Sequence, residues 1–213
     1  MKKIKGGVTS AIGFEAASTA AGIKYKERTD MALIYSQKPC KSAGTFTTNV
    51  VKAAPVIWDK SIVDSKLKPQ AIVVNSGIAN ACTGQEGLGY CAQTAQEVAK
   101  QLGVDGSAVL LGSTGVIGMQ LPIEKLKSGV MALAAKKNES VESGTEAAKA
   151  IMTTDTFEKE CAVTFEVDGV TVTVGGMAKG SGMIHPNMCT MLSFITTDAA
   201  ISKKALQSAL SGD

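Results

Sequence analysis

The chain has 213 residues, of which 45% are hydrophobic and 19% are charged, and its formal net charge is +3. This hydrophobic content excludes a disordered chain, and the near-neutral balance provides no basic surface for nucleic acid or an anionic membrane. No apolar run reaches the roughly 18 residues of a membrane span. The basic N-terminus is not followed by an apolar segment, so it does not resemble a signal peptide. We expect a globular, cytoplasmic chain of one or two domains.

The first half of the chain predicts buried strands and one long helix. Unbroken apolar runs at 31–35 and 71–74 are typical of strands buried on both faces. The Thr-rich residues 41–48 predict a further strand. Apolar residues recur at helical spacing over 85–102, and Gly103 follows as a helix stop.

The second half predicts a hairpin and further helices. Asp168 and Gly169 separate two alternating stretches, 162–167 and 170–174, which is the strongest hairpin signal in the chain. The other elements predicted are a helix from Pro122 to about 136, a helix over 141–152, a strand over 190–197 and a helix through 210 with Ser202 as its N-cap. No repeat or linker divides the chain. We expect an α/β layered architecture with parallel and antiparallel parts.

Five cysteines and one histidine do not predict a metal site. Cys40, Cys82, Cys91, Cys161 and Cys189 form no C-x-x-C pair, and only His185 could join them. Zinc needs four such ligands at close spacing. We expect reduced thiols, mostly buried as small hydrophobic side chains.

Two glycine-rich segments are candidates for chemistry. Residues 111–118 place three glycines around Ser113 and Thr114, which suits either a plain turn or an anion or oxyanion site. The phosphate-loop and dinucleotide patterns are both absent, which disfavours a nucleotide binder. Residues 175–192 are either a connector or a lysine-bearing site, and His185, before a proline, favours a structural role.

The run from Lys179 to Leu192 resembles the self-cleavage segment of ornithine acetyltransferases, the glutamate N-acetyltransferases of arginine biosynthesis. The resemblance extends over essentially the whole chain in the family's order. The supporting motifs are at 6–9, 13–14, 44–49, 74–84, 113–118 and 152–156. The family implies a layered α/β sandwich of stacked mixed sheets covered by helices, of the N-terminal-nucleophile type.

This resemblance also implies a mechanism. The precursor cuts itself between Cys189 and Thr190, and Thr190 becomes the nucleophile. Its freed α-amino group, with a pKa of roughly 7.7–8.0, then serves as the base. The acetyl group of N-acetylornithine passes to glutamate through an acetyl-threonine. Thr114 and Gly115 stabilise the oxyanion.

The family further implies that Thr153, Lys179 and Thr190 bind substrate, and that no metal or tightly held cofactor takes part. Some members accept acetyl-CoA as an alternative donor. The two segments of the precursor form an α/β heterodimer that assembles into a higher oligomer. An aminopeptidase of related self-cleaving architecture is an alternative, which the Lys179 segment disfavours.

The chain departs from the family pattern in two ways. Cys189 stands where alanine commonly precedes the nucleophile, a small-for-small exchange that we expect cleavage to tolerate. Residues 1–189 correspond to the α segment, and only the 24 residues 190–213 of the β segment follow. The alternative hypothesis is therefore a catalytically silent α segment that needs a separate β segment as its partner.

Overall fold

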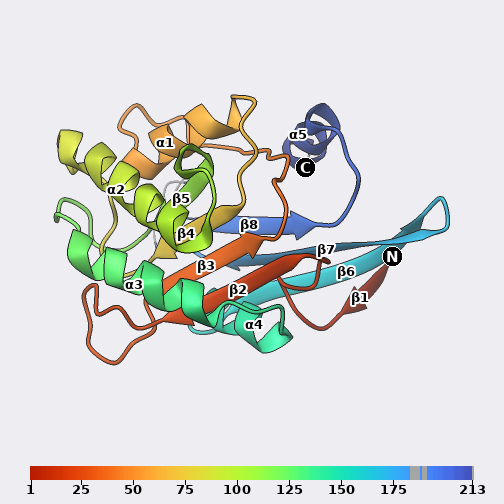
Figure 1. The fold of residues 1–213 in the computed structure, drawn as a ribbon, viewed down its shortest axis with the longest axis horizontal. Coiled ribbons are helices and arrows are strands. Elements are labelled where there is room, and N and C mark those ends of the chain that lie inside the picture. Colours follow the sequence, from red (N-terminus) through yellow and green to blue (C-terminus); the bar gives the residue numbers. More distant parts are fainter. Residues whose placement is uncertain (183–187, 189–190, 213) are drawn as a thin grey trace.

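The first of two sheets forms the centre of the molecule (Figure 1). The computed structural model describes residues 1–182, 188 and 191–212. The strand order of this sheet is β2-β3-β4-β5, and its last pair, β4 and β5, is parallel whereas the others are antiparallel. Its strands are β2 (Phe14–Thr19), β3 (Met31–Ser36), β4 (Ala71–Asn75) and β5 (Val109–Ser113).

The second sheet is antiparallel throughout, with the order β1-β6-β7-β8. Its strands are β1 (Lys2–Ile4), β6 (Lys159–Val167), β7 (Val170–Lys179) and β8 (Leu192–Thr197). Val167 pairs with Val170 across a two-residue turn in which Asp168 and Gly169 both have positive φ, +50° and +78°. The hairpin prediction is therefore confirmed, since two-residue turns of this kind match the twist of the strands.

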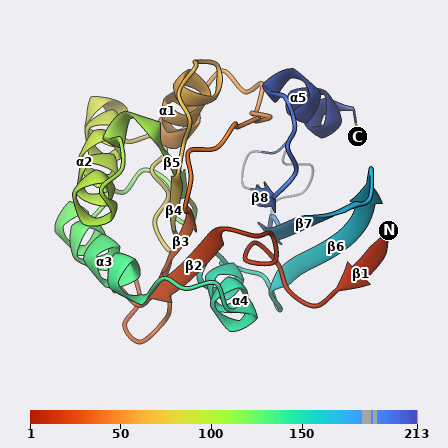
Figure 2. The same cartoon turned by 45° about the vertical axis from the view of Figure 1, so that its right-hand side comes forward.

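Helices within residues 54–136 cover one face of the first sheet, and the helix over 141–150 lies with the second sheet on the other face (Figure 2). The helices are α1 (Ala54–Val63), α2 (Gly84–Leu102), α3 (Ile123–Lys136), α4 (Val141–Ala150) and α5 (Lys203–Ser211), with a short 3-10 turn at Gly106–Ala108. Side chains such as Met31, Val98 and Leu133 form the core beneath α1, α2 and α3. A second core, with Ile34, Val74 and Met177, joins both sheets and α4. The predicted layered α/β architecture is confirmed.

Helix ends follow their sequence signals. Gly103 ends α2 in the left-handed conformation, with φ of +67°, and its N–H donates to Ala99 O at 2.9 Å. The Ser202 hydroxyl accepts from the N–H of Ala205 at 3.1 Å at the start of α5. Pro122 immediately precedes α3.

The strand predicted over residues 41–48 is wrong, because the chain there has no regular structure. The N–H of Cys40 donates to Pro69 O, and the N–H and carbonyl of Gly44 both bond the side chain of Gln207. A Thr-rich stretch favours extended backbone, but it becomes a strand only beside a partner strand. The helix α1 and the strands β1 and β2 were not predicted.

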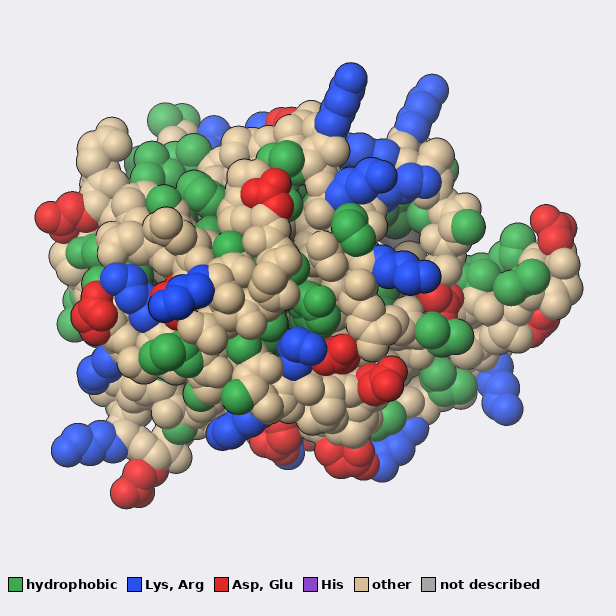
Figure 3. Space-filling view, viewed as in Figure 1, with side chains coloured by type: hydrophobic (Ala, Val, Ile, Leu, Met, Phe, Trp, Pro, Cys, Tyr) green, Lys and Arg blue, Asp and Glu red, His purple; other side chains and the backbone are tan. Residues whose placement is uncertain are grey.

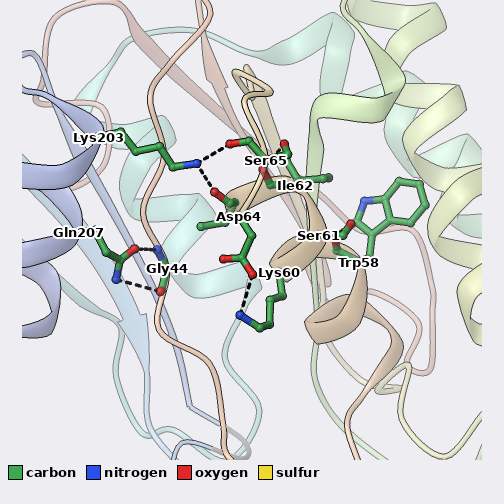
Figure 4. Close-up of polar contacts among 10 residues, drawn as sticks. Gly44, Trp58, Lys60, Ser61, Ile62, Asp64, Ser65, Lys203 and Gln207 are labelled. Atoms are coloured by element: carbon green, nitrogen blue, oxygen red, sulfur yellow. Dashed lines mark hydrogen bonds and ion pairs between the residues drawn. The ribbon is translucent and has the colours of Figure 1, made fainter.

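The helix α5 is held against the rest of the molecule by polar contacts (Figure 4). Gln207 accepts from Gly44 N at 3.0 Å and donates to Gly44 O at 3.2 Å. The Lys203 ammonium donates to the carbonyls of Val63 and Ser65, at the end of α1. None of the residues of α5 is fully buried.

The outer face of the second sheet carries a shallow groove of about 520 Å³. Cys161 and Ser193 on this face are exposed, and the side chains of Ile195 and Phe157 are 57% and 62% exposed. Elsewhere, Figure 3 shows charged side chains of both signs scattered over the surface it presents. Of the helices in the described part of the chain, none has the length and apolar character to cross a membrane.

Candidate active site

The parallel strands β4 and β5 end side by side, and the loops that follow them are joined. Ile78 and Val116 form a parallel bridge, in which Ala79 N donates to Val116 O at 2.8 Å and Val116 N to Gly77 O at 3.1 Å. The Ser113 hydroxyl donates to Ile78 O at 3.1 Å and accepts from Asn80 N at 2.8 Å. The carboxyl ends of parallel strands are a common place for ligands to bind.

Gly115 allows the two loops to approach this closely. Its φ is +134°, and a Cβ added there would lie 2.3 Å from both the carbonyl carbon and the oxygen of Gly77. No side chain fits at that separation, so the position requires glycine. The sequence prediction that this segment places backbone in close approach is therefore supported by its geometry.

The same turn presents hydrogen-bond donors. Thr114 is buried, and its N–H donates to Asn75 O at 3.0 Å, while Val116 N–H is also bonded. Within the described residues, neither the N–H of Gly115 nor the hydroxyl of Thr114 has a hydrogen-bond acceptor. Donors of this kind suit a developing oxyanion. The turn therefore has the free donors that the oxyanion hypothesis requires, and that hypothesis stays a prediction.

Thr153 lies in the turn after α4, and the Arg28 side chain bonds carbonyl groups of this turn. Arg28 Nη2 donates to Met152 O at 2.6 Å and reaches Thr153 O at 3.5 Å. The N–H of Thr153 donates to the Asp155 carboxylate at 3.3 Å. The backbone of this turn is thus held by one cation and one anion.

Lys179 ends β7, opposite Leu192 of β8, and only 3% of the residue is exposed. Its Nζ donates to Gly180 O at 2.8 Å. Burial lowers the pKa of the ammonium, the charge of Asp155 raises it, and the charge of Lys159 lowers it. A buried cation of this kind suits recognition of an anion such as a carboxylate.

Asp155 joins the Thr153 turn to the end of β7. Its Oδ1 accepts from Gly180 N at 2.7 Å and from Lys159 Nζ at 2.8 Å. Burial disfavours the charged carboxylate, but hydrogen bonds from Lys159, Gly180 and Thr153 outweigh it and lower the pKa of Asp155 to about 2. Asp155 therefore bonds both Thr153 and the residue that follows Lys179.

A buried hydrogen bond connects the loop after β4 to the end of α4. The Ser76 hydroxyl, in the loop after β4, donates to Ala150 O at the end of α4 at 2.7 Å. Ser76 N–H donates to Asp30 O at 2.8 Å. A Cβ on Gly112 in β5 would lie 3.2 Å from the Phe194 ring of β8. These contacts connect the loop after β4 to the end of α4, and they pack β5 against β8.

Three residues of the sequence hypothesis, His185, Cys189 and Thr190, lie outside the described residues. The four described cysteines are free thiols, and Cys91 is buried. Burial, with the nearby Asp59 charge, raises the pKa of Cys91 to about 12. Cys82 and Cys161 are exposed, so the expectation of mostly buried cysteines is wrong for these two. No group of three metal-ligating side chains occurs in the part of the chain that the structure describes.

Sequence reasoning missed Arg28, Ser76 and Asp155. Asp155 did lie within a quoted motif, 152–156, and an acid two residues after a predicted substrate threonine was a usable signal. Arg28 and Ser76 had no such signal. Their contacts join residues 124 and 74 positions apart, which only the fold brings together.

Comparison with known proteins shows which family the chain matches. The ArgJ family model matches residues 15–212. The arginine biosynthesis bifunctional protein ArgJ of Symbiobacterium thermophilum is 50% identical over 212 residues, which are 99% of this chain and 52% of that protein. The chain thus spans about half the length of the curated relatives it matches.

Two solved structures are similar over nearly their whole chains. ArgJ from Bacillus halodurans has a TM-score of 0.82 and 42% identity, covering 89% of this chain and 97% of that one. Ornithine acetyltransferase from Mycobacterium tuberculosis, in complex with ornithine, has a TM-score of 0.79 and 41% identity, covering 88% and 96%.

Proposed function

Because the chain belongs to the ArgJ family, we propose that it is part of an acetyltransferase that moves the acetyl group of N-acetylornithine to glutamate, with Thr190 as nucleophile. One observation carries the proposal. The loop that carries Ser76 and packs against Gly115 is bonded to the end of α4, and Asp155 bonds both the Thr153 turn after α4 and the residue that follows the buried Lys179. The segment that contains Thr190 leads from Lys179 into β8.

In the proposed reaction, the Thr190 hydroxyl attacks the acetyl carbonyl and its α-amino group takes the proton. The N–H of Gly115 and the hydroxyl of Thr114 stabilise the tetrahedral oxyanion, a contribution of about 2.7–4 kcal/mol per donor in comparable sites. Collapse breaks the C–N bond, and the leaving ornithine amine receives the proton. The glutamate amine then attacks acetyl-Thr190, which regenerates the hydroxyl and releases N-acetylglutamate.

Lys179 and Thr153 are proposed to hold the substrate end that both half-reactions share. N-acetylornithine and glutamate each carry an α-carboxylate, and a buried ammonium pairs with such a group more strongly than an exposed one. The M. tuberculosis relative was solved in complex with ornithine, which supports an amino-acid ligand of this chemistry.

Self-cleavage between Cys189 and Thr190 is proposed as the step that creates the base, because an amide nitrogen cannot accept the proton. Two observations support it. The B. halodurans chain matches over 97% of its length, yet it covers only 89% of this chain, or about 190 of 213 residues. That length is close to the 189 residues that precede the proposed cleavage point. In addition, β8 pairs with β7, so the two products would stay joined through one sheet.

We propose that the reaction uses no metal or tightly bound cofactor, since a hydroxyl, an amine and N–H donors supply every proton and charge that it requires. Acetyl-CoA remains a proposed alternative donor. The proposed setting is the cytoplasm, and the proposed assembly is an α/β heterodimer within a larger oligomer.

A second function is favoured by the half-length match to the curated relatives. On this alternative, the 213 residues alone are silent and need a separate β segment. Assaying acetyl transfer by the 213-residue chain, with and without the complementary segment of a full-length relative, separates the two. Turnover by the chain alone would exclude the silent segment.

Thr190→Ala tests the mechanism in the full-length protein. We expect the wild type to yield a fragment that begins at Thr190, whereas the variant stays uncleaved and loses transfer by at least about 1,000-fold. Mass spectrometry detects the fragment, and a coupled assay of N-acetylglutamate measures the transfer. Thr190→Ser retains a hydroxyl and Cys189→Ala restores the family residue, so both should still cleave. Normal transfer by Thr190→Ala would refute the mechanism.

A further inference from the structure

Asp155 is a buried acid that contacts both segments carrying the proposed substrate-binding residues. Its side chain is only 3% exposed. One carboxylate oxygen accepts from Gly180 N at 2.7 Å, directly after Lys179, and the other accepts from Thr153 N at 3.3 Å. Lys159 Nζ donates to the first oxygen at 2.8 Å. The carboxylate thus bridges the turn after α4 and the end of β7.

We propose that Asp155 is a positioning residue that fixes Thr153 and Lys179 relative to each other, so that both engage the α-carboxylate end of one amino-acid substrate. This inference rests on the proposed function, which assigns the substrate to these two residues. The two backbone bonds of Asp155 are charge-assisted, and such bonds hold geometry more firmly than neutral ones. Without them, each loop would be free to settle separately.

Asp155 also acts on the charge of Lys179. Of the charged groups that the structure describes, Asp155 and Lys159 are those that act on this ammonium, and they act in opposite directions. Burial favours the neutral amine, which cannot pair with a carboxylate. The Asp155 charge opposes that effect and therefore supports the binding form of Lys179.

The ion pair with Lys159 is a less complete explanation of Asp155. The Lys159 side chain is 38% exposed, and an ion pair with a solvated partner contributes little to stability. Neither Thr153 nor Gly180 would gain a fixed position from that pair alone. The hydrogen bonds to the two backbone N–H groups are what connect the loops.

The test measures the dissociation constant of ornithine by calorimetry from pH 6 to pH 10 in the full-length protein. Asp155→Asn keeps the shape but removes the charge, and we expect affinity to fall roughly tenfold or more at pH 7. As the pH rises, Asp155→Asn should lose ornithine binding at a lower pH than the wild type does, because the pKa of Lys179 falls when the Asp155 charge is removed. Lys159→Met should shift that loss to higher pH. Ornithine's own titration is common to all variants.

Glu146→Gln is the matched control, since Glu146 on α4 forms an exposed pair with Lys149 and should leave affinity unchanged. Opposite pH shifts in Asp155→Asn and Lys159→Met support the proposal, because general damage would not give opposite signs. Equal affinity of Asp155→Asn and wild type overturns it while leaving the function intact. If Asp155→Asn does not fold, an unshifted Lys159→Met profile overturns it. Absence of both ornithine binding and transfer in wild type overturns the function as well.

Discussion

Gly115 shows how one residue determines whether two loops can meet. Its backbone conformation and its contact with Gly77 each exclude a side chain, and the contact is with backbone atoms that cannot rotate away. Either feature alone would disfavour substitution. Together they connect the stability of the fold to the geometry of the proposed oxyanion site.

We expect Gly115→Ala to lower the free energy of unfolding by about 2–3 kcal/mol, from the strained backbone and the clash. Urea unfolding followed by circular dichroism measures this change. Gly89→Ala, in α2 with no atom within 4 Å of the added Cβ, should instead stabilise by roughly 0.5–1 kcal/mol. Equal stability of Gly115→Ala and wild type would contradict the clash.

Among the elements, α5 differs from the other helices in how it is held. It contributes no fully buried side chain, so hydrophobic packing contributes little to its position. The paired hydrogen bonds between Gln207 and Gly44, and the bonds from Lys203 to the end of α1, join it to segments about 140 to 160 residues earlier. Such an element opens locally at low cost.

Gln207→Ala should therefore release α5 without unfolding the molecule. We expect amide hydrogen exchange over residues 203–211 to rise about 30-fold, since two hydrogen bonds of roughly 1 kcal/mol each are lost. Mass spectrometry of the exchanged peptides measures this rise. Lys204→Ala, an exposed position of the same helix, is the control. Faster exchange spread over the whole chain would show global destabilisation instead.

Elements with local signals were predictable from sequence, and elements defined by distant partners were not. The hairpin at Asp168, the end of α2 at Gly103 and the N-cap of α5 at Ser202 are each determined by a few neighbouring residues. The strand β1 has three residues and exists only because it pairs with β6. The helix α1 carried one usable signal, Pro55 in its first turn.

The candidate site divides in the same way. The glycine pattern around Gly115 predicted close backbone approach, and the family resemblance supplied Thr153 and Lys179. The acid that joins them depends on a contact between residues 155 and 180, 25 positions apart. No periodicity or propensity encodes that contact, because it arises from the packing of α4 and β7 around a shared core.

At the scale of the whole molecule, the two faces of the second sheet differ. One face lies in the core with Met177, whereas the other carries exposed Ile195 and Phe157 along a groove. Contiguous exposed apolar surface is uncommon on monomeric proteins and marks interaction surfaces or aggregation hazards.

We expect the 213-residue chain to bind an apolar dye such as ANS in its native state, through this groove. Ile195→Thr keeps β-branching but removes apolar area, so it should reduce the dye fluorescence by about half. Val50→Thr, a 93% exposed position outside the groove, should leave the fluorescence unchanged. Equal fluorescence of Ile195→Thr and wild type would place the dye elsewhere.

The positions of the strands along the chain also determine the order in which the two sheets can fold during synthesis. Every strand of the first sheet lies between residues 14 and 113, so that sheet can assemble while the ribosome is still translating the rest. The strand β1 must wait for β6, because Lys2 pairs with Thr164. The second sheet is completed only when β8, the last strand, has emerged. The loops after β4 and β5 are therefore made well before the segment that the proposed mechanism cuts. The first sheet can thus be folded before the bond to be cleaved has been synthesised.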